Sequence, residues 1–183
     1  MSDFSAVYPL KSGRTHEVCG AGAQFFAVAI AAQFEAQFLW VREQWRTEKL
    51  NPTGFVEFLS PEGLLTASAK NQNEVLAVAE ESLRSGVVPL VVMELNNQLD
   101  LIAGRRLQLA AKTGESTALA IISEKMGSNA AETRWRCSPL FDPNDSTLQR
   151  WELIKNKTGT LGVWNVRWSA SSRRINVVSE AGI

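Results

Sequence analysis

Residues 15–43 read THEVCGAGAQFFAVAIAAQFEAQFLWVRE, and this stretch decides the fold. It predicts a strand over His16–Cys19, a glycine turn over Gly20–Gly22, a helix over 23–34 and a strand over Phe38–Arg42. Strand, helix and strand in this order form the opening unit of an open α/β sheet. The helix is apolar nearly all round, so we expect it to be packed between layers.

The Gly20–Gly22 turn stands where many α/β proteins hold a phosphate, because glycines let backbone N–H groups point at an anion. A working P-loop reads G-x-x-x-x-G-K-[ST]. Counted from Gly20, Phe25 replaces the second glycine, Phe26 the lysine and Ala27 the hydroxyl residue. The sequence therefore predicts a degenerate P-loop in which Gly20, Gly22, Phe25 and Phe26 mark a vestigial nucleotide site.

The chain of 183 residues is long enough for one compact domain with a sizeable core. We expect residues 1–14 to form an irregular arm, attached to the body by Tyr8 and Leu10. Residues 15–178 are expected to form the domain and residues 179–183 a tail.

Composition argues against several classes of protein. No apolar run approaches the roughly 20 residues of a membrane helix, and the first residues lack the layout of a signal peptide. We therefore expect a cytoplasmic protein that contacts no membrane. With one histidine and two cysteines, Cys19 and Cys137, a zinc site is not expected, and neither is any other cofactor. Both cysteines are predicted to be small buried side chains.

The chain between residues 55 and 122 continues the alternation of strands and helices. The expected strands are Phe55–Leu59, Val87–Leu95 and Thr117–Ile122. One helix is expected to start at Asn71 or Asn73 and to stop at Gly86, and another to span about 98–112 and to close at Gly114. This order is typical of a mostly parallel sheet.

Beyond Met126 the pattern changes to alternation with period two. The expected strands are Thr133–Cys137, Trp151–Lys155, Val163–Trp168 and Arg174–Val178. Alternation with turn-rich joints indicates an antiparallel meander. The predicted fold class is therefore α/β, with a mostly parallel central sheet extended by a C-terminal antiparallel meander.

Charge is divided unevenly along a chain whose net charge is zero. Residues 1–100 hold 7 Lys/Arg against 12 Asp/Glu, and residues 101–183 hold 12 against 7. Basic residues of the second half lie beside four of the six tryptophans, an arrangement that suits single-stranded DNA or a protein partner. Core packing of the tryptophans is the alternative. The candidate DNA- or partner-binding residues are Arg105, Arg134, Arg136, Lys155, Lys157, Arg167, Arg173 and Arg174.

His16 is the one histidine of the chain and precedes a predicted buried strand. No serine or cysteine stands in a recognisable nucleophile elbow, so a catalytic triad has no support. We expect His16 to have a structural role.

The assembled segments resemble the translesion-synthesis family ImuA, within the wider RecA-like group that also contains the division inhibitor SulA. The likeness covers about residues 14–178. It is carried by HEVCGAGA, FLWVRE, SLRSGVVPLVVMEL, LDLIAGRRLQLAAKTG, TALAII, TRWRCSPL and WELIKNKTG. The resemblance implies a RecA-like three-layer fold.

The resemblance also directs attention to carboxylates at the ends of the predicted strands. In RecA-type ATPases acidic groups lie there beside the nucleotide, and here Glu43, Glu94 and Glu124 take such places. Without a P-loop lysine they would repel a triphosphate. The plainer interpretation is that each pairs with a basic neighbour, Arg42, Arg105 or Lys125, or faces water.

The resemblance implies a non-catalytic accessory protein of SOS-type DNA-damage tolerance. Its partners would be a RecA filament, or a Y-family polymerase-like subunit with an error-prone replicative-type polymerase. The alternative is a SulA-like inhibitor that binds the division GTPase, with which the short segment before the first strand is compatible. A nucleotide-binding enzyme with an unconventional loop is a third, weaker reading. The sequence leaves the oligomeric state open, and an exposed edge strand would allow self-association.

Overall fold

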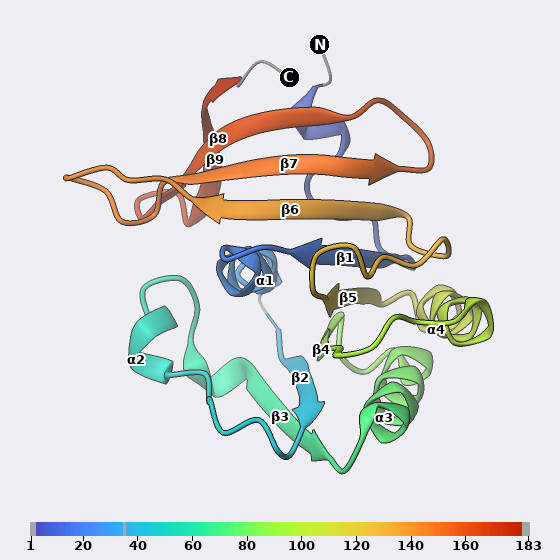
Figure 1. The fold of residues 1–183 in the computed structure, drawn as a ribbon. Coiled ribbons are helices and arrows are strands. Elements are labelled where there is room, and N and C mark those ends of the chain that lie inside the picture. The colour runs from blue at the N-terminus through green and yellow to red at the C-terminus, as the bar shows by residue number, and fades with distance from the viewer. Residues whose placement is uncertain (1–2, 35, 181–183) are drawn as a thin grey trace.

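A computed structural model describes residues 3–34 and 36–180 of the chain (Figure 1). The α-helices are α1 (Ala23–Ala31), α2 (Pro52–Phe55), α3 (Gln72–Ser85) and α4 (Leu101–Gly114), with short 3-10 helices η1 (Phe4–Ala6) and η2 (Pro61–Gly63). The strands are β1 (Thr15–Cys19), β2 (Phe38–Glu43), β3 (Leu64–Ala69), β4 (Leu90–Glu94), β5 (Thr117–Ile121), β6 (Thr133–Pro139), β7 (Gln149–Asn156), β8 (Gly162–Ser169) and β9 (Arg174–Glu180).

The nine strands of the described residues form one sheet in the order β3-β2-β4-β5-β1-β6-β7-β8-β9. Strands β3 to β6 in this order run parallel, and β7, β8 and β9 continue the sheet in antiparallel fashion. The predicted α/β class, with a mostly parallel sheet extended by a C-terminal meander, is therefore confirmed. One detail differs, because β6, the first strand of the expected meander, runs parallel to β1.

Helices cover both faces of the parallel part of the sheet. Figure 1 shows α1 and α2 on one side of it and α3 and α4 on the other. The first core contains the α1 side chains and alternate residues of β2, such as Trp40, while the second contains Val41 and the buried faces of α3 and α4. Helix α1 is buried along most of its length, as its apolar composition predicted.

The two long helices of the second face have clear sequence boundaries. The Asn71 side chain accepts a hydrogen bond from the Glu74 N–H at the start of α3, and Gly86 ends that helix with φ of 67°. Asp100 caps α4 in the same way. Gly114, expected as the stop of this helix, is its last residue, and the left-handed C-cap is Glu115. Gly114 allows α4 to approach α3, because a Cβ there would collide with the Leu83 carbonyl.

The strand predicted at Phe55–Leu59 is wrong. Asn51 accepts a hydrogen bond from the Thr53 N–H and Pro52 occupies the first helical position, so residues 52–55 form α2 instead. The strand of this region is β3, at the edge of the sheet. Several β3 side chains are exposed. Because such a strand needs no apolar cover, its sequence LLTASA lacks the continuous apolar run that marks a strand covered on both faces.

The meander alternates as its sequence predicts. Trp135, Trp151, Trp164 and Trp168 are all buried in the first core, so core packing of these tryptophans is confirmed. Tyr8 and Leu10 attach the arm to this core, as expected. Strand β9 reaches Glu180, two residues into the expected tail, and residues 1–2 and 181–183 lie outside the described residues.

Candidate functional site

The turn at the predicted P-loop is short, and one of its backbone N–H groups is already bonded to a neighbouring strand. Three residues join β1 to α1, and the Gly22 N–H donates to the Cys137 carbonyl of β6 at 2.8 Å. Gly20 has φ of 92°, and a Cβ on it would collide with the same carbonyl. Gly20 is therefore required by the close approach of β6, and a Cβ on Gly22 would meet Gln149 Oε1 of β7 as well as Cys137, whether or not a phosphate is ever bound.

The residues that replace the P-loop lysine and hydroxyl belong to the core. Phe26 is fully buried, with its ring centroid 4.7 Å from that of Trp151 and 5.5 Å from that of Trp135. Ala27 is also fully buried. Phe25 is partly buried and meets Phe58 edge to face at 5.5 Å. A lysine at position 26 would thus point into an aromatic cluster.

Two of the three predicted carboxylates lie in one network at the ends of β2 and β4. Glu94 is buried and accepts from Trp40 Nε1 at 2.7 Å, from Arg42 Nη2 at 3.0 Å and from Arg46 Nη1 at 3.1 Å. The expectation that Arg42 neutralises a carboxylate is confirmed, whereas the part played by Arg46 was missed. Arg46 follows β2 in an irregular segment, where neither periodicity nor a motif marks it.

Glu43 joins the same network through its neighbours. It accepts from Trp45 Nε1 at 2.6 Å and from Asn96 Nδ2 at 2.9 Å, and Asn96 in turn accepts from Arg46. Glu124 is exposed in the turn after β5 and does not belong to this network. Arg42 and Arg46 thus balance the charges of Glu43 and Glu94.

Most of the candidate DNA-binding residues of the meander already have partners within the chain. Arg134 is paired with buried Glu17 at 2.7 Å, and Arg136 lies 3.4 Å from Glu152. Lys155, Lys157 and Arg134 all reach the loop before β6: Lys155 and Arg134 donate to the Ser128 carbonyl and Lys157 to the Ala130 carbonyl. Burial lowers the pKa of Lys155, with Arg134 a further cause. These three residues tie β6 and β7 to a loop.

The remaining basic candidates lie apart from this group. Arg167 is held by Asp145 at 3.4 Å, and Arg105 is exposed on α4. Arg173 and Arg174 line a cavity of about 1030 Å³ beside the C-terminal end of α1. Both arginines were candidates for DNA or partner binding in the sequence analysis. The cavity could not be predicted, because its walls come from four segments that are distant in the sequence.

His16 is the centre of a buried hydrogen-bond chain. Its Nε2 lies 2.9 Å from the Lys11 carbonyl, which can only accept, so Nε2 carries the proton. Its Nδ1 therefore accepts from Thr133 Oγ1 at 2.7 Å, and that oxygen accepts from Trp135 Nε1 at 3.1 Å. Burial, assisted by Arg14, lowers the pKa of His16 to about 4. The arrangement gives His16 a structural role.

This pKa predicts a pH-dependent stability. The unfolded histidine takes up a proton near pH 6.5 and the folded one only near pH 4, so the stabilisation present above pH 6.5 is lost as the pH falls toward 4. Urea unfolding should show the wild type losing about 2 kcal/mol more than His16→Gln between pH 7.5 and pH 5. Equal losses in both proteins would contradict the assignment, because the chain has no second histidine.

The described part of the chain contains neither a disulfide nor a candidate metal site. Cys19 and Cys137 are both buried and unpaired by a disulfide, as the sequence predicted, and burial raises the pKa of each thiol. Across residues 3–34 and 36–180, no three histidine, cysteine or acidic side chains are grouped so as to hold a metal ion. Within the same ranges, every helix falls short of the length and apolarity required to span a membrane.

Comparison with known proteins adds no family to this picture. No protein-family model matches the chain, and no curated protein matches it. The observations establish the class: an α/β protein whose described residues form a nine-stranded sheet, with Phe26 and Ala27 buried in its core.

Proposed function

We propose that this chain is a RecA-like, non-catalytic accessory protein of the ImuA type. It would act in DNA-damage tolerance by binding a RecA filament or components of an error-prone polymerase. The sequence segments quoted above support the proposal. A parallel sheet continued by antiparallel strands, with helices on both faces, is also the architecture that this resemblance implies.

The observation that carries the proposal is the filled turn at the start of α1. Phe26 and Ala27 are fully buried, and the Gly22 N–H is already bonded to Cys137. A P-loop needs free backbone N–H groups, a lysine for the phosphates and a hydroxyl for the metal ion. A chain that keeps the sheet but uses this position for packing is better suited to binding another protein than to hydrolysing ATP.

The internal pairing of the basic residues favours protein partners over DNA. Binding to single-stranded DNA requires lysine and arginine side chains that can neutralise phosphates, together with exposed aromatic rings. In the meander the four tryptophans are buried, while Arg134, Lys155 and Lys157 are occupied by Glu17 and by backbone carbonyls. We therefore place the interaction with RecA protein ahead of direct contact with DNA.

Co-sedimentation with RecA filaments tests this function. The chain should pellet with RecA assembled on single-stranded DNA in a slowly hydrolysed ATP analogue at physiological salt. It should stay in the supernatant with DNA alone, because the tryptophans of the meander are buried and Arg134, Lys155 and Lys157 are held within the chain. The pelleted fraction is measured by gel densitometry against added protein.

Two results would overturn the assignment. Pelleting with DNA in the absence of RecA would make the protein a DNA-binding module. Failure to pellet with the filament, combined with filamentous growth of cells that express the chain, would favour the SulA-like alternative.

A further inference from the structure

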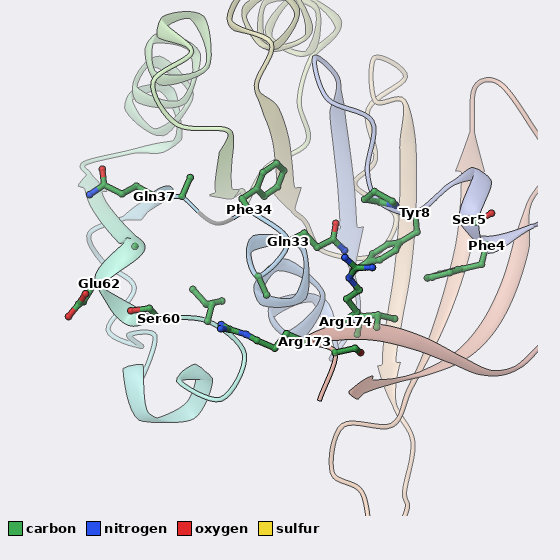
Figure 2. Close-up of a pocket in the computed structure, with 17 residues that line it drawn as sticks. Phe4, Ser5, Tyr8, Gln33, Phe34, Gln37, Ser60, Glu62, Arg173 and Arg174 are labelled. Atoms are coloured by element: carbon green, nitrogen blue, oxygen red, sulfur yellow. The ribbon is translucent and has the colours of Figure 1, made fainter. Parts of the chain in front are cut away.

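A cavity in this structure lies at the opposite end of α1 from the glycine turn. Four segments enclose about 1030 Å³: the N-terminal arm, the end of α1, residues 59–63 and the start of β9 (Figure 2). This volume is at the upper end of the range of about 300–1,000 Å³ that small-molecule sites occupy. No residue of the glycine turn lines it, so it is separate from the vestigial nucleotide site.

One part of the cavity wall is aromatic and apolar. Phe4, Tyr8, Phe34 and Leu59 contribute to it, and the rings of Phe4 and Tyr8 stack at 4.9 Å. Phe4 and Tyr8 also contact buried tryptophans, which hold them in place. A wall of this kind offers a flat apolar surface to a ligand ring.

The cationic part of the wall comes from Arg173 and Arg174. Among the described residues neither arginine has a carboxylate within ion-pair distance, in contrast to Arg42, Arg46 and Arg134. Arg173 donates to the Phe58 carbonyl at 3.2 Å. Figure 2 shows Arg174 pointing toward Gln33 and Tyr8, away from the end of the cavity where Glu62 lies. Positive charge is thus available at one end of an apolar cavity.

A buried hydroxyl beside Arg174 lacks a partner. Tyr8 is only 8% exposed, and its Oη makes no hydrogen bond with any described group. The Gln33 side chain is near enough to affect this hydroxyl, but the two do not meet hydrogen-bond geometry. Burial raises the pKa of Tyr8, so the hydroxyl keeps its proton and can donate. The oxygen is covered by its neighbours, so a ligand acceptor would reach it only when a covering side chain moves aside. Such a contact would satisfy a buried donor that is otherwise left unpaired.

We propose that this cavity binds a small organic anion with a flat apolar body. The apolar body would lie against Phe4, Phe34 and Leu59, and the anionic group would take charge-assisted hydrogen bonds from Arg174 and a further one from the Tyr8 hydroxyl. The inference does not depend on the proposed accessory function, and binding of a ligand to this cavity can be tested without RecA or DNA.

The probe for this site is 8-anilinonaphthalene-1-sulfonate, an aromatic anion whose fluorescence rises in apolar surroundings. We expect saturable binding at one site of the folded protein. Arg174→Gln should weaken it at least tenfold, because it removes a charge-assisted contact. Arg105→Gln, an exposed arginine on the far helix α4, is the matched control and should leave the dissociation constant unchanged. Amide NMR shifts should change around Gln33, Phe34, Ser60 and Arg174.

The neutral analogue N-phenyl-1-naphthylamine, which lacks the sulfonate, separates charge recognition from general hydrophobic binding. Its affinity should be the same for the wild type and Arg174→Gln. The proposal is overturned if the sulfonate probe does not saturate, if Arg174→Gln binds it as tightly as the wild type, or if both probes weaken in parallel. Shift changes confined to other parts of the molecule would also overturn it.

Discussion

Replacing Phe26 with lysine, the change that restores the charged residue of a P-loop, is expected to unfold the protein. Phe26 is fully buried between Trp135 and Trp151. Removing a buried phenyl ring costs about 3–5 kcal/mol. A buried lysine has a pKa of about 5–6, so giving up its proton at pH 7 adds about 5 kcal/mol. The sum rivals a typical total stability of about 5–15 kcal/mol.

Circular dichroism and urea unfolding measure this effect. The matched control is Gln24→Lys, which adds the same charge two residues earlier on the same helix, where the side chain is exposed. Its effect on the free energy of unfolding should stay within about 0.5 kcal/mol. A folded Phe26→Lys protein that binds ATP would contradict our interpretation, since the turn would then have lacked only its lysine.

Replacing Arg134 with methionine is expected to cost about 3–5 kcal/mol of stability. Arg134 is the charge partner of Glu17, which is 1% exposed and whose other oxygen accepts from the Ser128 N–H at 2.8 Å. Without the guanidinium, the carboxylate is left buried without its counter-charge. The same residue was a candidate for DNA binding, so the experiment also decides between a structural and a ligand-binding role.

Arg136→Met is the control for this prediction. Arg136 lies two residues further along β6 and has a carboxylate 3.4 Å away, but it is 40% exposed. Exposed ion pairs contribute about 0–1 kcal/mol, so its loss should be small. The double change Glu17→Gln with Arg134→Met should recover part of the stability, because it removes the buried charge. Equal losses for Arg134→Met and Arg136→Met in urea unfolding would contradict the argument.

The sequence predicted best where local pattern and tertiary environment agree. The covered strand β4 reads as an apolar run, and Asn71 and Gly86 mark the ends of α3 with cap residues. The alternation of the tryptophans in the meander indicated which face of its strands is buried. Strand β3 was missed because, as an edge strand with exposed side chains, it is held by pairing with β2 and carries little apolar signal.

The candidate site was only partly predictable. The departure from the P-loop pattern is visible in the sequence, but the close approach of Cys137 of β6 to Gly20 and Gly22 can be seen only in the fold. The sequence predicted that Arg42 pairs with a carboxylate, but its partner Glu94 lies on the adjacent strand β4, and Arg46 reaches Glu94 from an irregular segment. Arg174 and Tyr8 are 166 positions apart, and no local pattern links them.

The packing of Phe4 has a practical consequence for handling this protein. Its ring lies 5.3 Å from that of Trp164, and Trp164 is in register with Glu180 on β9. The beginning and the end of the described chain therefore lie side by side, and Phe4 at the beginning also lines the cavity. An affinity tag placed ahead of Phe4 would lie near that cavity, so such a tag should be cleaved off before any ligand is titrated.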